Sequence, residues 1–151
     1  MFRGVSTLNL DAKGRMAMPS KYRERLLDQC AGQLVVTVDL SDPCLLLYPL
    51  PEWEDIEHKL VRLGNLNPQA RRLQRLLIGH ATEVELDNNG RILLPPALRE
   101  FASLDKRIAL TGQGKKFEIW NENTWNEARQ GWLAADETGG EISVDLESLS
   151  L

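Results

Sequence analysis

The chain of 151 residues is 42% hydrophobic and 26% charged, which is ordinary for a globular protein and leaves room for one domain or two small ones. It shows neither a secretory signal peptide nor an apolar run long enough to cross a bilayer, so we expect a cytoplasmic protein without a membrane partner. Its net charge of −4 would argue against a nucleic-acid partner if the charges were spread evenly.

Seven elements follow one another in the first half of the chain: strand, turn, strand, helix, strand, strand and helix. Their expected ranges are 5–10, 11–14, 15–19, 21–29, 34–40, 44–49 and 51–63. Asp11 and Gly14, at the first and fourth positions of the turn, suit a type I turn, because glycine is free to take a positive φ. Ser20 is placed to cap the helix that follows.

A further helix is expected over residues 69–78, a stretch that contains neither glycine nor proline. Its apolar residues fall at helical spacing, and three arginines would project from the other side. The apolar residues are Ala70, Leu73, Leu76 and Leu77, and the arginines are Arg71, Arg72 and Arg75. We interpret the arginine face as a solvated helix surface.

The second half of the chain repeats the first. At an offset of 76, residues 10–24 and 86–100 share seven identical residues out of fifteen, where unrelated segments would share about one. The pentads DAKGR and DNNGR carry part of this match, and residues 44–53 resemble residues 116–125 farther along. A period this long is not that of a solenoid, so the sequence indicates one small domain that was duplicated.

The second copy is expected to repeat the order of the first, ending in a helix over residues 124–133 that Asn123 could cap. The predicted division is a first repeat over 5–53, a helical linker over 54–80, a second repeat over 81–125, and a C-terminal helix with an acidic tail over 126–151. We expect the tail to be mobile, or docked only through its last leucines.

A repeat of only about fifty residues buries too little apolar surface to be stable alone. Two repeats that interleave their hairpins into one barrel would solve this problem. The sequence therefore predicts a mostly β fold with short helices (α+β), in which two swapped-hairpin repeats form one pseudo-symmetric barrel. The same size argument would also fit a homodimer of chains.

Charge is strongly segregated along the chain. Residues 1–25 carry a net charge of +4 and residues 59–80 carry +5, whereas residues 26–58 carry −7 and residues 81–151 carry −6. Such segregation concerns partners rather than fold. It indicates a positive face on an acidic protein.

The duplicated DxxGR hairpins, each followed by a proline and a short arginine-bearing helix, resemble the swapped-hairpin AbrB fold. Two copies in one chain that opens MFRG are similar specifically to the MraZ family of bacterial transcriptional regulators. The similarity covers the whole chain and is carried by MFRGVSTLNLDAKGRMAMPSKYRERL, CLLLYPLPEWEDIEHKL and RRLQRLLIGHATEVELDNNGRILLPPALR.

This resemblance implies a sequence-specific DNA-binding protein associated with the nucleoid. Members of the family lie at the head of the division and cell-wall gene cluster, bind direct repeats in its promoter, generally repress it, and assemble into closed rings. The family associates DNA contact with the DxxxR turn, which corresponds here to Asp11–Arg15 and Asp87–Arg91. We therefore expect double-stranded DNA and further copies of the chain as partners, and no small-molecule ligand.

Arg15 follows a narrow hairpin that could enter a major groove, as the β-ribbon DNA-binding proteins do. Its planar guanidinium matches guanine or a phosphate. The alternative is that Asp11 and Arg15 only pair across the turn and hold its shape, and the two roles are compatible. We expect Asp11 and Gly14, and likewise Asp87 and Gly90, to serve the turns structurally.

The two hairpins differ in charge. Arg3, Lys13 and Lys21 surround the first, whereas the second has Asn89 in place of Lys13. Because phosphate contacts depend on lysine and arginine, we predict that the first copy is the main DNA-binding repeat. The second copy, with Arg91, should contribute weakly or serve as barrel scaffold and ring interface.

Arg23 and Arg99 are also repeated, but in the first turn of a helix, where the dipole disfavours a cation. We expect a structural ion pair or a contact between subunits at these positions. The four tryptophans should pack in the core or in an interface rather than stack on single-stranded bases.

The remaining reactive side chains form no recognisable site. Cys30 and Cys44 make no ligand cluster with His58 or His80, so we predict reduced cysteines, no metal and no cofactor. The sequence lacks a phosphate loop, a nucleophile elbow and an HExxH motif, so an enzyme is not expected.

One other class of function stays open. AbrB-like barrels also serve as oligomeric scaffolds or as antitoxin-type modules that bind a protein. Toxin-binding members usually carry one barrel and a disordered C-terminal segment. The duplication, which uses nearly the whole chain, disfavours this class, whereas the acidic tail is compatible with it.

Overall fold

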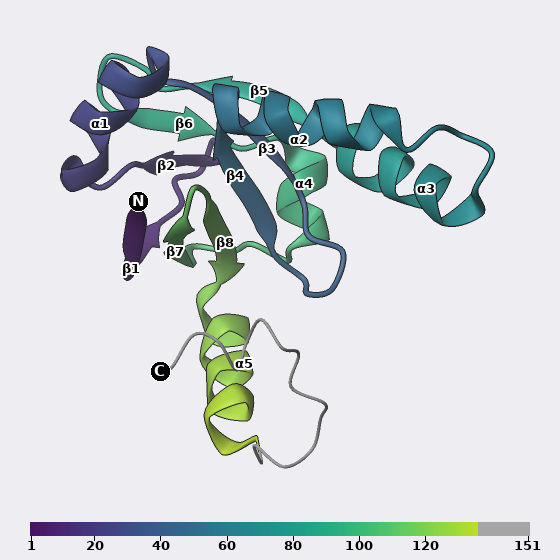
Figure 1. Cartoon of the computed structure of the whole chain (residues 1–151). Helices are drawn as coiled ribbons and strands as arrows, with labels where there is room; N and C mark the ends of the chain where they lie inside the picture. Colours follow the sequence, from purple (N-terminus) through teal and green to yellow (C-terminus); the bar gives the residue numbers. More distant parts are fainter. Residues whose placement is uncertain (136–151) are drawn as a thin grey trace, which may run out of the picture.

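Eight strands and six helical segments make up residues 1–135, the part of the chain that the computed structural model describes (Figure 1). In chain order the first half contains β1 (Phe2–Asn9), β2 (Arg15–Ala17), α1 (Ser20–Cys30), β3 (Gln33–Val38), β4 (Leu45–Pro49), α2 (Leu50–Arg62), α3 (Pro68–Leu73) and the π-helix η1 (Gln74–Ile78). The second half contains β5 (Thr82–Glu85), β6 (Arg91–Leu93), α4 (Pro96–Phe101), β7 (Arg107–Gly114), β8 (Phe117–Asn121) and α5 (Glu122–Ala134). The fold is α+β, as the sequence predicts.

Six strands form one antiparallel sheet in the order β1-β7-β8-β4-β3-β5. β1 pairs with β7, and β5 pairs with β3, so the first strand of each repeat completes the hairpin of the other. β4 and β8 pair at the centre. Exchanging the two repeats only reverses the strand order, which is the signature of two-fold pseudo-symmetry. The interleaving expected from the small size of each repeat is therefore present.

The remaining strands, β2 and β6, form a separate two-stranded antiparallel ribbon. Met16 pairs with Ile92 at its centre, and both side chains are fully buried. They join the main core, to which the inner faces of β3 and β7 also contribute. The ribbon is therefore anchored to the sheet by one apolar residue from each repeat.

The sheet also carries two smaller apolar clusters, the first formed by residues of the first repeat and the second mainly by residues of the second repeat. The first outer cluster consists of Val35, Leu46, Tyr48, Trp53 and Leu60. The second outer cluster consists of Cys44, Ala109 and Trp120. The low exposure of Trp53 and Trp120, at 3% and 1%, confirms the predicted packing role for these two tryptophans.

α2, α3 and η1 form a helical arm at one side of the molecule (Figure 1). α3 and η1 together occupy the predicted helix, with Ala70 buried and the three arginines exposed. The arm is anchored to the sheet by the Thr37 hydroxyl of β3, which donates a hydrogen bond to the Leu77 carbonyl at 2.7 Å. Among residues 1–135, no helix has the length and apolar character of a membrane span.

Two expected helix caps are wrong. α1 begins at Ser20 itself, Pro19 precedes it, and no side chain caps the helix. At α5 the cap is Asn121 rather than Asn123, because β8 runs directly into the helix. The side-chain oxygen of Asn121 accepts a hydrogen bond from the Thr124 N–H at 3.1 Å.

Candidate nucleic-acid interface

The first DxxGR turn is held in shape by its aspartate. Oδ1 of Asp11 accepts hydrogen bonds from the Lys13 and Arg15 N–H groups at 3.0 and 2.8 Å, and Oδ2 accepts one from Arg15 Nε at 2.8 Å. These bonds, the one from the Arg15 backbone first, lower the pKa of the Asp11 carboxyl. Gly14 closes the turn at a φ of 87°, where a side chain would be strained.

The second turn has nearly the same backbone geometry. Oδ1 of Asp87 accepts hydrogen bonds from the Asn89 and Arg91 N–H groups at 2.8 and 2.9 Å. The Arg91 backbone bond is again the first cause that lowers the pKa of the carboxyl. The side chains differ, because Arg91 Nε lies 3.7 Å from Oδ2 of Asp87, too far for a hydrogen bond. The Arg15 guanidinium is therefore the more firmly oriented of the two.

The ribbon brings both arginines to one surface. In the β2–β6 register Arg15 lies opposite Leu93, and Arg91 lies opposite Ala17. Side chains alternate along a strand, so these four residues lie on the face away from the buried Met16. The two turns thus stand at opposite ends of one ribbon, and their arginines share its outward face.

Each turn is tied to the other repeat by a backbone hydrogen bond. The Leu94 N–H donates to the Gly14 carbonyl, and the Met18 N–H donates to the Gly90 carbonyl, both at 2.9 Å. Each glycine therefore closes its own turn, and its carbonyl also binds the residue that follows the ribbon strand of the other repeat.

Arg99 and Arg23 cover the turns, again across the repeats. Arg99 Nε donates to the Leu94 carbonyl at 3.0 Å, and a Cβ on Gly14 would come within 2.5 Å of the guanidinium carbon. Arg23 lies in the same way over the glycine of the second turn, and its Nε donates to the Met18 carbonyl at 2.6 Å. Among the described residues neither arginine forms the expected ion pair. Instead, each guanidinium donates to a carbonyl of its own repeat and packs on a turn of the other.

Arg3 and Lys21 lie close together at the start of β1, away from the first turn. Lys21 Nζ is 4.9 Å from the centroid of the Tyr22 ring, and the Tyr22 hydroxyl donates to the Arg3 carbonyl. The Lys21 ammonium, which comes from the start of α1, therefore lies beside the start of β1. The eight residues from Arg3 to Asp11 span about 25 Å of extended chain. The predicted DNA-binding residues fall into two groups: Lys13, Arg15 and Arg91 at the ribbon, and Arg3 and Lys21 beyond it.

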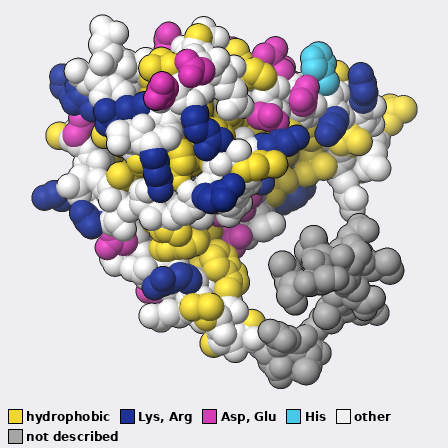
Figure 2. Space-filling view, turned by 60° about the vertical axis from the view of Figure 1, so that its left-hand side comes forward, with side chains coloured by type: hydrophobic (Ala, Val, Ile, Leu, Met, Phe, Trp, Pro, Cys, Tyr) yellow, Lys and Arg dark blue, Asp and Glu magenta, His cyan; other side chains and the backbone are white. Residues whose placement is uncertain are grey.

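The side of the molecule that carries β1, β2 and α1 comes forward in Figure 2. Lysine and arginine side chains are spread over the middle of this face among apolar ones, and most acidic side chains lie toward its upper part (Figure 2). Basic side chains are thus present on the face that carries β1, β2 and α1, together with acidic ones (Figure 2).

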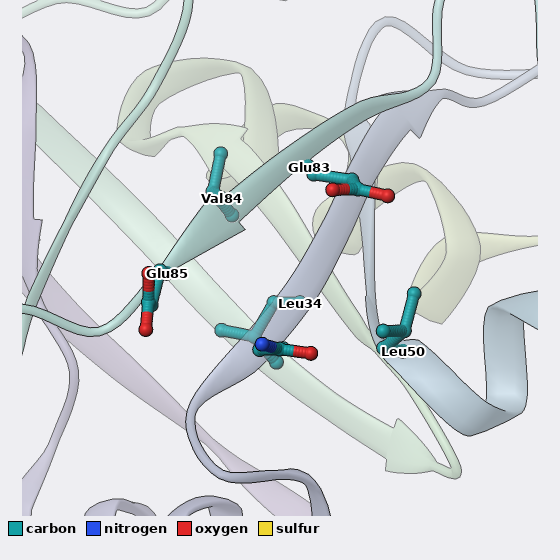
Figure 3. Close-up of a pocket in the computed structure, with 6 residues that line it drawn as sticks. Leu34, Leu50, Glu83, Val84 and Glu85 are labelled. Carbon is teal, nitrogen blue, oxygen red and sulfur yellow. The ribbon is translucent and has the colours of Figure 1, made fainter.

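A pocket at the β3–β5 edge has the opposite character. It measures about 250 Å³ and is lined by Gln33, Leu34, Leu50, Glu83, Val84 and Glu85 (Figure 3). Both glutamates come from the edge strand β5, and no basic residue lines the pocket. Because carboxylates repel phosphates, we place this edge outside the candidate interface.

The described residues contain no group of three His, Cys, Asp or Glu side chains placed to hold a metal ion. Cys30 and Cys44 are free, and burial raises the pKa of both thiols. Neither cysteine is therefore an activated nucleophile.

Comparison with known proteins gives two consistent findings. The family model described as "MraZ protein, putative antitoxin-like" matches residues 1–76 and 77–137. Three relatives, each named "Transcriptional regulator MraZ", are similar over the full length of both chains. They are from Thioalkalivibrio sulfidiphilus (62% identical over 151 residues), Halorhodospira halophila (57% over 152) and Pseudomonas aeruginosa strain UCBPP-PA14 (56% over 151).

Proposed function

Since the chain belongs to the MraZ family, which consists of transcriptional regulators and not of enzymes, we propose that it regulates transcription by sequence-specific binding of promoter DNA through the β2–β6 ribbon. The observation that carries this proposal is the presence of Arg15 and Arg91 on one outward face. A two-stranded ribbon fits the major groove of B-DNA, where base edges are distinguishable.

Arg15 is the proposed base-contacting residue. Its Nε is bound to Asp11, which leaves the two terminal nitrogens of the guanidinium free to donate. Two such donors match O6 and N7 of guanine, and a contact of this kind discriminates between bases by about 1–3 kcal/mol. Lys13, exposed on the same turn, would bind phosphate and add affinity without sequence preference.

We further propose that the first turn is the main DNA-binding element. Its arginine is oriented by a bond of 2.8 Å, whereas the corresponding separation at Arg91 is 3.7 Å. Asn89 also removes the cation that Lys13 supplies in the first turn. Arg3 and Lys21 would extend the phosphate contacts beyond the ribbon.

The targets and the assembly rest on the family resemblance. We propose that the protein acts in the cytoplasm at the nucleoid, binds direct repeats in the promoter of its own division and cell-wall gene cluster, and represses it. We also propose that the two repeats close into a barrel and that several chains assemble into a ring, so that neighbouring subunits bind successive DNA repeats.

The test is binding to DNA from upstream of the protein's own gene, against a scrambled fragment of equal length, over a range of salt concentrations. A specific regulator should prefer its own fragment and lose affinity steeply as salt rises. Equal and weak binding to both fragments would contradict the proposal. Ring assembly is checked separately by the mass of the protein in solution, where a stable monomer would count against it.

The role of each turn is tested by substitution. Arg15→Ala should weaken binding to the specific fragment by roughly tenfold or more without changing the oligomer mass. Arg91→Ala should have a smaller effect, and Arg129→Ala, on the exposed surface of α5, serves as the matched control. A larger loss from Arg91→Ala would reverse the assignment of the two turns.

The word "antitoxin-like" in the description of the family model favours a protein-binding module as the second candidate. This function would leave the affinity for DNA low, independent of sequence and insensitive to Arg15→Ala. The same binding experiment therefore separates the two candidates.

A further inference from the structure

Five basic residues meet at one corner of the sheet, outside the ribbon and both DxxGR turns. They come from the start of β1, from the first half of α1 and from the turn between β7 and β8. We call them the basic corner, which consists of Arg3, Lys21, Arg25, Lys115 and Lys116.

Strand register brings two of these residues into one row. Arg3 lies opposite Gln113 in the β1–β7 pairing, and the Gln113 N–H donates to the Lys116 carbonyl at 2.9 Å. Arg3 and Lys116 are therefore two strands apart, which is about 10 Å. Their side chains lie on the same face of the sheet, because their neighbours Phe2 and Phe117 are both buried on the other face.

Arg25 and Lys115 reach the same end of β1. The guanidinium carbon of Arg25 lies 4.5 Å from the centroid of the Phe2 ring, and its Nη1 donates to the Met1 carbonyl at 3.0 Å. A Cβ on Gly114, the residue before Lys115, would lie 3.5 Å from Met1 Sδ. Together with the Lys21 ammonium beside β1, all five basic side chains therefore surround the start of this strand.

The corner keeps an excess of positive charge although acids border it. Glu24 and Asp28 lie on α1, and Glu118 follows Lys116 by two residues on β8. The Glu118 carboxylate accepts a hydrogen bond from the Trp120 indole N–H at 2.9 Å. Within residues 1–135 every ion pair involves other basic residues, so no carboxylate is paired with the corner. Five cations beside three acids leave it positive.

The corresponding positions of the other half of the molecule carry no basic residue. The counterparts of Arg3, Lys21 and Arg25, at the offset of 76, are Gly79, Ala97 and Phe101, and those of the two lysines, at the offset of the β4 and β8 segments, are Pro43 and Cys44. A requirement of the fold would apply to both halves, because the repeats have the same order of elements. The five cations therefore indicate a function that belongs to one corner only.

α1 places the basic corner next to the second turn rather than the first. The Tyr22 hydroxyl donates to the Arg3 carbonyl, and the next residue, Arg23, packs on Gly90 of the second turn. The corner is therefore one helix diameter, about 10 Å, from the second turn. The length of β1 separates it from the first turn by about 25 Å. Cations that flank the first hairpin in sequence thus lie nearer to the second turn in the structure.

Building on the proposed DNA-binding function, we propose that the basic corner binds the phosphate backbone beyond the second turn, while Arg15 contacts the bases. Lysine and arginine bind phosphates without reading sequence. Lys21 follows Arg15 by six residues, so at most about 20 Å, or about six base-pair steps, separates them. β1, β2 and α1 also share the face on which basic side chains are spread in Figure 2. The first repeat would thus supply the cations that Asn89 leaves out of the second turn.

The test measures binding to the fragment from upstream of the protein's own gene, and to the scrambled fragment, over a range of salt concentrations. Lys115→Gln/Lys116→Gln should weaken both complexes by the same factor. It should also reduce the slope of log affinity against log salt by about 1.8 per subunit, because each lost phosphate contact removes about 0.9. Arg71→Gln/Arg72→Gln removes the same charge from exposed positions of α3 and, as the matched control, should leave the slope unchanged.

Sequence preference separates the corner from the ribbon. Lys115→Gln/Lys116→Gln should leave the ratio of the two affinities unchanged, whereas Arg15→Ala should lower it. Arg3→Gln and Lys21→Gln should each reduce the salt slope by about 0.9, again with the ratio unchanged.

Equal slopes for the corner variant and the control variant would overturn the proposal. So would a lower oligomer mass of the corner variant with an unchanged slope, since the corner would then be an interface between subunits. Equal and weak binding of the parent protein to both fragments would instead contradict the proposed function, on which the role of the corner depends. The parent and the variants therefore report the two failures separately.

Discussion

Asp11 and Asp87 have the same role in the two turns, because the carboxylate of each accepts hydrogen bonds from the backbone N–H groups of its own turn. The bonds to the Arg15 and Arg91 backbones are the first cause that lowers the pKa of these carboxyls in the folded state. An unfolded aspartate has a pKa of about 3.9. Stability from each turn is therefore complete above that value and is lost as the pH falls through the lower, folded pKa.

This linkage predicts a specific acid response. The urea midpoint of the parent protein should fall between about pH 5 and pH 3, and that of Asp11→Asn should fall less over the same range, because the variant has no carboxyl to protonate at that turn. Asp87→Asn should behave in the same way. Parallel curves for the parent and both variants would show that the turns do not contribute to the acid sensitivity.

Two features favour glycine at position 14: its positive φ and the close approach of Arg99. Their contributions to the free energy of unfolding can be measured separately. Gly64 has a similar φ of 73°, and a Cβ added there would meet no atom within 4 Å, so Gly64→Ala should cost only the backbone strain, about 1–2 kcal/mol. Gly14→Ala should cost about 1 kcal/mol more, because the new methyl displaces the Arg99 guanidinium from its hydrogen bond to the Leu94 carbonyl.

A double-mutant cycle checks this partition. In an Arg99→Ala background the excess cost of Gly14→Ala over Gly64→Ala should disappear, as measured by the free energy of unfolding in urea. An excess that survives the loss of Arg99 would mean that the turn backbone, and not the guanidinium, resists the methyl group.

At the scale of elements, the helical arm is attached to the sheet by apolar contacts and by the hydroxyl of Thr37. Thr37→Val keeps the shape of the side chain and removes the hydrogen bond to Leu77, which should cost about 1 kcal/mol. The loss should appear as faster amide exchange in η1 and α3, and the ribbon should be unaffected. Thr7→Val, at an exposed position of β1, is the matched control. Equal changes in the two variants would indicate that the arm is held by apolar contacts alone.

Local pattern was sufficient to predict most elements, and the small size of each repeat predicted that their hairpins interleave, but neither predicted the contacts of individual side chains. The DxxGR spacing, the alternating strands and the helical period of residues 69–78 each depend on neighbours in sequence, and all three are present in the structure. The repetition of Arg23 and Arg99 was visible in the sequence, yet their role was not. An arginine repeated at this position could cover the turn of its own repeat or the turn of the other repeat. The repeated sequence would be the same in both cases. Only the three-dimensional exchange of strands distinguishes them.

At the scale of the whole molecule, neither repeat contains a complete sheet. Within the described residues, β1 has its ladder partner in the second repeat, and β5 has its partner in the first. We therefore predict that fragments 1–80 and 81–151 are each unfolded as monomers and fold when mixed. Circular dichroism and size-exclusion chromatography of the separate and mixed fragments would measure this. A separate fragment that is folded and monomeric would contradict the prediction.

The crossing of Arg23 and Arg99 over the turns has a consequence for how this chain can evolve. In a dimer of two identical single-repeat chains, every substitution would appear at both tips. A gene that encodes both repeats in one chain removes that restriction, so Lys13 and Asn89 can differ while the backbone of both turns stays the same. Arg23 and Arg99 restrict the two repeats in a different way, because each arginine packs on the turn glycine of the other repeat. Mutation is thus free to diversify the outward tips, one at a time, whereas each arginine remains coupled to the glycine of the other repeat that it covers.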